Sequence, residues 1–256
     1  MLATCALYSG DMRDWNRARA QLMALRRKRP ESKAAMITEA ALGGVLYLRE
    51  APDWLQKGRF EAFPACSYPA LFYLYAKWLL MEKRYSELLT AVGPMIVSVR
   101  ATGALLSELY LHLIAGAADR IAGEEQEAQR HIEIALTLAL PDGLYGVLAE
   151  YRRQLGKPLD DALKRRAPAA LASVREVYDH IAAGFTSLHN AVTGDVLTNE
   201  LTLREYEIAA LALHGQSNAA IARRIGVRPG SVKVYFNAVY QKLGVSGREE
   251  LGKYIL

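Results

Sequence analysis

The feature that most constrains the fold is a tight turn after Gly226 that separates two short helical patterns. Before the turn, Ser217 or Asn218 is expected to cap a helix that continues to Arg224. After the turn, Pro229 can open a second helix, because the first helical position needs no backbone N–H. Short helix, tight turn and second helix together predict a helix-turn-helix.

Two further helices are expected beside this motif. One begins at Thr202, with Glu205 three residues later as in a capping box, and ends at Gly215. The other begins at Ser246, with Glu249 in the equivalent position, and continues to the C-terminus. The last part of the chain is therefore expected to form a small four-helix domain.

The helix predicted over residues 230–243 has two different faces. Apolar residues at steps of three and four form one stripe, made of Val232, Tyr235 or Phe236, Val239 and Leu243. This stripe is expected to pack against Ile208, Leu211, Ile221 and Ile225. The opposite face carries Ser231, Lys233, Val234, Asn237 and Gln241.

That outer face suits a DNA duplex. A major groove offers phosphates to a cation, donor and acceptor edges to amide side chains, and thymine methyl groups to an apolar side chain. All three kinds of side chain are present. An ordinary solvated helix face is the alternative, which the helix-turn-helix context disfavours.

Residues LTLREYEIAALALHGQSNAAIA and IGVRPGSVKVYFNAVYQKLGV resemble the LuxR-type (GerE or FixJ/NarL-type) DNA-binding domain of bacterial transcription factors. The resemblance runs from the LT-x-RE-x-E-I opening through SVKV to the KLGV close and covers about a fifth of the chain. It implies that the third helix reads the major groove, with Lys233, Val234 and Asn237 at the bases and Ser231 near a phosphate. We add Gln241 to the expected base contacts, and Ser217, Arg228 and Lys242 to the expected phosphate contacts.

Three positions depart from the family's usual pattern. Ala219 stands where a charged or polar residue is common, Arg228 replaces the usual serine, and Tyr235 replaces a frequent histidine. The operator sequence therefore does not transfer from the family. The alternative function is a protein–protein interaction scaffold whose helix-turn-helix no longer binds DNA.

The same resemblance implies a homodimer on DNA, because the family's fourth helix commonly makes a two-fold contact. Leu251, Tyr254 and Ile255 are apolar residues at a chain end that so small a domain hardly needs for its own core. We expect these three to form the dimer contact, which would place two recognition helices about 34 Å apart on an inverted-repeat operator.

Upstream, residues 1–168 show helical patterns broken at Gly or Pro and no alternating strand pattern, so the whole chain is expected to be all-α. Helix starts follow positions 13, 52, 83, 123 and 157, in steps of 39, 31, 40 and 34. Tetratricopeptide repeats have a period of about 34 residues. The pattern predicts an α-solenoid of tetratricopeptide-like helix pairs that binds an unknown protein, peptide or small-molecule effector.

The solenoid pattern, with the segment ALTLALPDGLYGVL, and the LuxR-type segment together resemble the C-terminal half of the large MalT-like regulators. Those regulators carry an ATP-binding module upstream. The sequence contains no G-x-x-x-x-G-K-[ST], so no bound nucleotide or other cofactor is expected.

One long helix is expected over residues 169–193. Its apolar residues follow a heptad seam: Leu171, Val174, Tyr178, Ile181, Phe185, Leu188 and Val192. A coiled-coil dimer and a helix that caps the solenoid both fit, and we favour the cap. With a linker at Thr193 to Asp195, the expected domains are 1–168, 169–195 and 196–256.

Two groups of residues in the array have both a functional and a structural interpretation. Tyr73, Tyr75 and Trp78 suit a ligand groove or a core, and we favour the core. The run from Arg26 to Arg29 suits DNA or a solvated helix end, and we favour the helix end.

Composition narrows the function further. Residues 201–256 hold 8 Lys+Arg against 4 Asp+Glu, whereas residues 1–200 hold 24 against 23, which suits a C-terminal partner such as double-stranded DNA. Cys5 and Cys66 are expected to be reduced core thiols, and no nucleophile–base pair, metal cluster or phosphate loop predicts an enzyme. No run without Asp, Glu, Lys or Arg is longer than Ala62 to Ala76, which is too short to cross a bilayer, so we expect no membrane contact and a cytoplasmic location.

Overall fold

A computed structural model describes residues 5–6, 9–46, 51–193, 201, 203–213 and 215–253. These residues form helices and no strand, which confirms the all-α prediction. Their contacts divide the chain into two compact units, one that contains Trp15–Ile181 and one that contains Ala182–Leu256.

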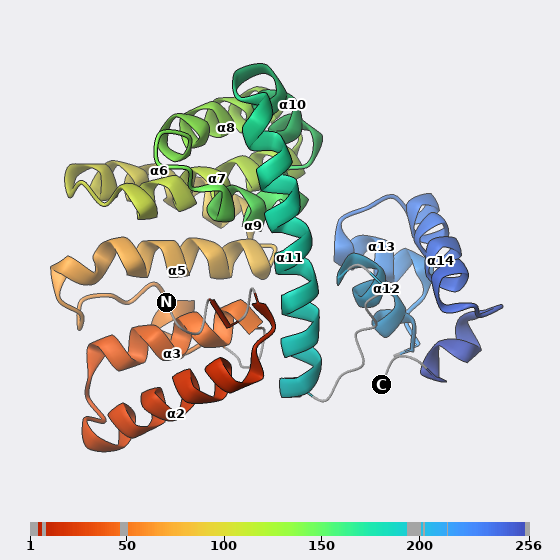
Figure 1. The fold of residues 1–256 in the computed structure, drawn as a ribbon, viewed down its shortest axis with the longest axis horizontal. Helices are drawn as coiled ribbons and strands as arrows, with labels where there is room; N and C mark the ends of the chain where they lie inside the picture. The colour runs from red at the N-terminus through yellow and green to blue at the C-terminus, as the bar shows by residue number, and fades with distance from the viewer. Residues whose placement is uncertain are drawn as a thin grey trace. The chain divides into compact units, whose positions relative to one another are not determined.

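The helices of the array follow one another in antiparallel pairs (Figure 1). In chain order they are α2 (Met12–Lys28), α3 (Lys33–Leu46), α4 (Asp53–Gln56), the 3-10 helix η1 (Ala65–Ser67), α5 (Tyr68–Met81), α6 (Tyr85–Ala101), α7 (Leu105–Ala122), α8 (Glu125–Ala139), α9 (Tyr145–Leu155), α10 (Lys157–Arg166) and α11 (Pro168–Thr193). Helices begin at residues 12, 53, 85, 125 and 157, each within two residues of a predicted start. The N-terminal region is therefore built from packed helix pairs, as the breaks at Gly and Pro predict.

The pair α7 and α8 shows how the sequence makes such a corner. Gly123 ends α7 with φ +90°, a left-handed conformation that glycine adopts without the steric cost of a Cβ. Gly116 lets the two helices approach, since a Cβ there would lie 3.2 Å from the Cβ of His131 and 3.3 Å from the carbonyl oxygen of Ala128. Both glycines therefore serve the packing of this pair.

Helix α7 forms the centre of the main core and contacts α5, α6, α8 and α9. From Leu109 to Asp119 every residue except Tyr110 is buried. The buried set includes the ionisable residues Glu108, His112 and Asp119 as well as leucines and alanines. The middle of α7 is therefore enclosed by its neighbours, whereas Leu105, Leu106 and Ile121 at its two ends are exposed.

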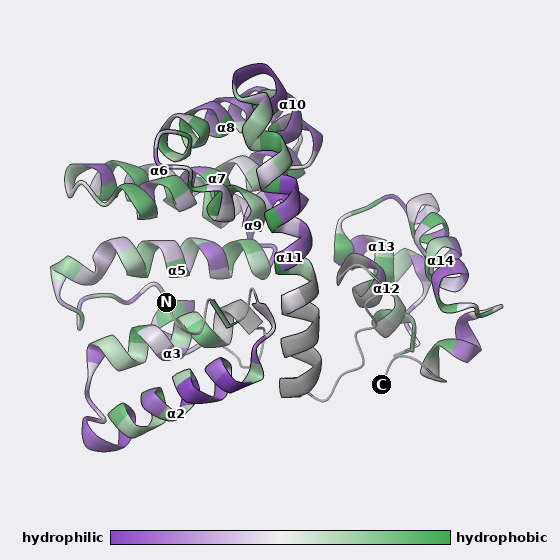
Figure 2. Cartoon of the chain, viewed as in Figure 1, coloured by the Kyte–Doolittle hydropathy of each residue, from purple (hydrophilic) through white to green (hydrophobic). Residues whose placement is uncertain are grey.

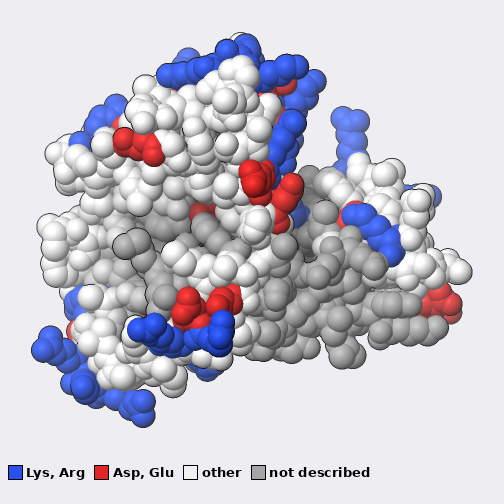
Figure 3. Space-filling model, viewed as in Figure 1, with Lys and Arg blue, Asp and Glu red and all other residues white. Residues whose placement is uncertain are grey.

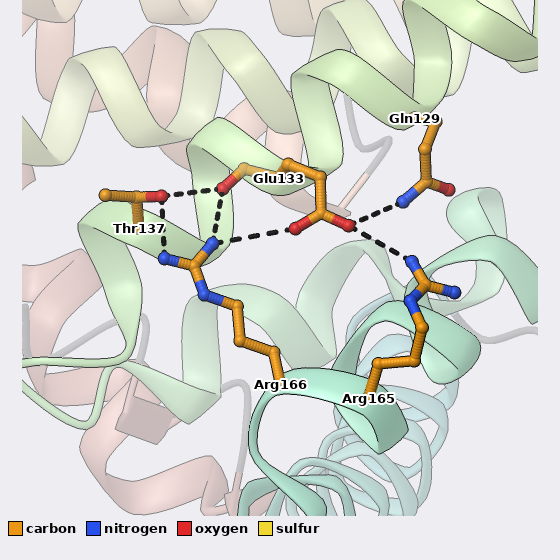
Figure 4. Close-up of polar contacts among 5 residues, drawn as sticks. All are labelled: Gln129, Glu133, Thr137, Arg165 and Arg166. Atoms are coloured by element: carbon orange, nitrogen blue, oxygen red, sulfur yellow. Dashed lines mark hydrogen bonds and ion pairs between the residues drawn. The ribbon is translucent and has the colours of Figure 1, made fainter.

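Exposed polar contacts join α8 to α10 (Figure 4). Arg165 donates to the Glu133 carboxylate at 3.1 Å, and Arg166 donates to the Glu133 carbonyl at 3.1 Å and to the Thr137 hydroxyl at 3.0 Å. Lys and Arg gather on the surface over α10 and the end of α2 (Figure 3). Positive charge is therefore not confined to the C-terminal unit.

The first half of α11 packs on the array. Ala170 and Val174 are buried in the main core, and Leu171, Tyr178 and Ile181 pack against it. Asp160 of α10 accepts hydrogen bonds from Arg152 at 2.8 Å and from Arg175 of α11 at 2.9 Å. As far as Ile181, the apolar residues of the heptad seam therefore pack against the array itself. This packing favours the capping helix over the coiled-coil dimer. The side chains of Phe185, Leu188 and Val192, like the linker residues 194–195, lie outside the described part.

The remaining features of the array include one correction. Cys5 and Cys66 are exposed free cysteines and not core residues. Cys66 lies on the short helix η1, none of whose residues is buried. Tyr73, Tyr75 and Trp78 are half-buried against the core, in line with the structural interpretation. Arg26 to Lys28 form the last turn of α2.

None of the described helices combines the length and apolarity that a membrane crossing requires.

The C-terminal unit contains α12 (Leu203–Leu213), α13 (Asn218–Ile225), α14 (Pro229–Leu243) and the 3-10 helix η2 (Arg248–Lys253). Helix α14 contacts α12 and α13, and η2 contacts α12. One core joins these elements, so the unit has a hydrophobic centre of its own.

Candidate nucleic-acid interface

Local sequence signals fix α13 and α14. Ser217 caps α13, since its Oγ accepts the backbone N–H of Ala220 at 3.3 Å. Gly226 ends α13 with φ +69°, and Pro229 opens α14 within its first turn. The predicted helix-turn-helix is confirmed. Thr202, the expected cap of α12, lies outside the described residues.

The inner face of α14 is the predicted stripe. Val232, Phe236, Val239 and Leu243 are buried, and they share a core with Ile208, Leu211, Ile221 and Ile225. The choice between Tyr235 and Phe236 is decided in favour of Phe236, since Tyr235 is only half-buried. Four anchors on one side fix the rotation of the helix about its axis.

Because these anchors fix the helix, the opposite face of α14 points toward solvent. Lys233, Asn237 and Gln241 are exposed, and Val234 has 68% of its surface exposed, an unusual position for an apolar side chain. Apolar and polar residues alternate around α14 (Figure 2). The four expected base contacts thus lie together on one helix face.

The expected phosphate contacts have mixed environments. Ser217 and Arg228 are exposed, and Ser231 is half-buried at the start of α14. Lys242 has a partner inside the domain, because its Nζ donates to both carboxylate oxygens of the buried Glu205, at 2.7 and 2.9 Å. This ion pair gives Lys242 a structural role and does not support a phosphate contact.

Residues 199–255 match the protein family described as bacterial regulatory proteins of the luxR family. The C-terminal domain is a luxR-family helix-turn-helix domain. The family consists of transcription regulators and not of enzymes, which confirms the expectation that the chain is no enzyme.

Proteins named HTH-type transcriptional regulator MalT are similar to a larger part of the chain. The protein from Klebsiella pneumoniae (strain 342) is 31% identical over 162 residues, which cover 57% of this chain and 17% of that protein. The proteins from Cronobacter sakazakii (strain ATCC BAA-894) and Yersinia pestis (strain Pestoides F) are 30% identical over 162 and 140 residues. The chain thus spans about a sixth of the length of the curated relatives it matches. No solved structure gives a significant match.

The end of the luxR-family domain differs from the expected fourth helix. Within the described residues it is the 3-10 helix η2, and the backbone N–H of Ser246 donates to Glu250 at 2.8 Å, one residue beyond the expected Glu249. Leu251 is fully buried in the core of its own domain. A side chain without exposed surface has nothing to give to a dimer contact, so Leu251 leaves that prediction. Tyr254 and Ile255 lie outside the described residues.

Sequence reasoning missed one group beside the recognition helix. Asn218, Lys233, Phe236, Asn237, Tyr240 and Arg248 line an open depression of about 350 Å³. Arg248 is 30 residues from its partner Asn218. No local spacing signals such a contact.

Among the described residues, no cluster of three or more His, Cys, Asp or Glu could hold a metal ion.

Proposed function

We propose that the chain is a DNA-binding transcription regulator whose helix α14 reads bases in the major groove. The expected base contacts are Lys233, Val234, Asn237 and Gln241, with Ser217, Arg228 and Ser231 at phosphates. The observation that carries this proposal is the outer face of α14, where an apolar side chain with 68% of its surface exposed stands between a cation and an amide. Each of these groups has a complement on the edge of a base pair.

We further propose that residues 1–168 form a tetratricopeptide-like sensor domain, that 169–195 connect and cap it, and that 196–256 bind DNA. The helix pairs and the similarity to MalT proteins over more than the luxR-family segment support this division. Helical-repeat arrays commonly bind proteins or peptides, so the effector is sought there. A DNA target implies a cytoplasmic location.

The regulator is expected to act as a homodimer on an inverted-repeat operator, with recognition helices about 34 Å apart. This proposal now rests on Tyr254, Ile255 and the family resemblance. A footprint that covers a single half-site, with a one-to-one complex in sedimentation, would contradict it.

The deciding experiment is selection of bound duplexes from a random DNA pool with the full chain, followed by binding of two variants. Asn237→Ala should cost about 1–3 kcal/mol at one base position and little elsewhere. Lys233→Ala should weaken binding to all duplexes and lower the salt dependence by about one contact. Absence of salt-dependent DNA binding by the parent chain would replace this function with the interaction scaffold, for which Ala219 and Tyr235 are the motivating departures.

A further inference from the structure

Arg248 lies beside the recognition helix and is fixed from two sides. Its guanidinium carbon is 5.1 Å from the centre of the Phe236 ring of α14. Its Nη2 donates to Oδ1 of Asn218, the first residue of α13, at 3.2 Å. The Phe236 ring stacks in turn on Tyr240, with 5.6 Å between the ring centres. A side chain that is usually free to move is thus held in one place.

The depression that Arg248 lines has the chemistry of an anion site. Two cations, Lys233 and Arg248, and two amides, Asn218 and Asn237, supply its polar groups. Phe236 and Tyr240 supply the aromatic part, and none of the six lining residues is a carboxylate. The depression therefore offers several hydrogen-bond donors and a positive charge without a competing acid.

The position of this depression selects a DNA phosphate as the anion. Lys233 and Asn237 belong both to the depression and to the outer face of α14 that we assign to bases. When a recognition helix lies in the major groove, the preceding helix crosses the sugar–phosphate backbone. Asn218 opens that preceding helix, so the backbone would pass the depression.

We propose that the depression binds one backbone phosphate and that Arg248 is the residue that holds α14 in register on the duplex. A guanidinium has five N–H donors, of which Asn218 takes one, so a fork remains for two phosphate oxygens. Because Phe236 and Asn218 already orient it, little side-chain freedom is lost on binding. This inference rests on the proposed DNA-binding function.

The test measures binding of the full chain to a selected duplex and to an unrelated duplex over a series of salt concentrations. Arg248→Gln should weaken binding about tenfold on both duplexes and lower the slope of log K against log[salt] by about one contact. Arg248→Lys keeps the charge without the fork, so the parent's slope should return with intermediate affinity. Asn218→Ala frees the guanidinium, which should cost about two- to threefold with the slope unchanged.

Arg130→Gln is the matched control, since Arg130 is an exposed arginine of α8 in the array and does not line the depression, and it should leave affinity and slope unchanged. If the parent chain binds no duplex, the proposed function fails. If the parent binds and Arg248→Gln keeps both its affinity and its slope, the phosphate site is refuted while the proposed function stands. Loss of affinity with the parent's slope in both Arg248 variants would show a merely structural arginine and would also refute the site.

Discussion

Helices α7 and α14 are both largely apolar, with 18 and 15 residues, yet their surroundings differ completely. The middle of α7 is enclosed by other helices, and even its ionisable residues Glu108, His112 and Asp119 are buried. Helix α14 is anchored by four residues on one side and bare on the other. The two helices show two different constraints on side chains. In the middle of α7 the neighbouring helices constrain the size and shape of each side chain, whereas on the outer face of α14 only the bound partner would do so.

The largest effect is expected in the enclosed helix. Leu113→Ala removes a fully buried side chain of α7 and should lower the free energy of unfolding by about 2–5 kcal/mol. Urea unfolding followed by tryptophan fluorescence measures this, because Trp15, Trp54 and Trp78 all report on the array.

Leu106→Ala, on the same helix with 52% of its surface exposed, is the control and should change the free energy of unfolding by less than about 0.5 kcal/mol. Equal effects of the two substitutions would show that α7 is not the centre of the core.

A second effect comes from the ionisable residues of α7. The Nδ1 atoms of His112 and His131 lie 2.7 Å apart, so only one proton fits between them. Burial and the neighbouring His131 lower the pKa of His112 from 6.5 to about 4, and burial lowers the pKa of His131. Burial, with Glu127 and Glu124, raises the pKa of Asp119 from 3.8 to about 6.

These shifts oppose each other in acid. Between pH 6.5 and 4 the unfolded chain binds more protons than the native chain at His112, so stability falls as the pH falls. Between pH 6 and 3.8 the native chain binds more protons at Asp119, so that group adds stability as the pH falls. The two contributions largely offset each other in the parent chain.

Asp119→Asn should expose the histidine contribution. From pH 6 to pH 4, its free energy of unfolding should fall by about 2 kcal/mol more than that of the parent. Urea unfolding at several pH values measures the difference, with Asp142→Asn at an exposed position as the control. Parallel pH profiles for all three proteins would count against the buried cluster.

A third prediction compares the two faces of α14. Lys242→Met removes the two hydrogen bonds that Lys242 donates to the buried Glu205 carboxylate and should destabilise the C-terminal unit by about 1–2 kcal/mol. Lys233→Met, on the outer face, should cost less than about 0.5 kcal/mol. Hydrogen exchange of peptides from α12 and α14, measured by mass spectrometry, reports both values.

Addition of Glu205→Gln to Lys242→Met removes the buried negative charge that Lys242 faces in the parent and should restore part of the lost protection. If the two single lysine variants exchanged equally fast, the ion pair would be irrelevant to stability, and Lys242 would return to the expected phosphate contacts.

The features that the sequence predicted are those with a local cause. The stripe on α14 follows from helical periodicity, and the ends at Gly123 and Gly226 follow from the left-handed conformation that only glycine adopts easily. The helix starts of the array were predictable for the same reason, since Gly, Pro and acidic residues mark them within a few positions.

The features that sequence reasoning missed are contacts between distant residues. Glu205 and Lys242 are 37 residues apart, and Asn218 and Arg248 are 30 apart. The burial of Leu251 likewise depends on how η2 packs on α12, which periodicity in a short segment does not reveal. The outer face of α14 was predictable because it is local, whereas the depression beside it required three elements to meet.

The smallest expected effects test whether the turn and the recognition helix depend on the backbone alone. Gly226 and Gly230 both have open space where a Cβ would be built, but only Gly226 has a positive φ, +69°. Gly226→Ala should therefore cost about 1 kcal/mol through backbone strain, whereas Gly230→Ala should stabilise α14 by about 0.5 kcal/mol through helix propensity. Hydrogen exchange of the α13 and α14 peptides measures both signs. If both substitutions changed stability in the same direction, the turn would not be held by the left-handed residue. If Gly230→Ala raised stability but weakened DNA binding, the glycine would be explained by close approach of the duplex to the start of α14. Such an approach constrains the exposed face of α14, whereas no partner approaches the buried middle of α7.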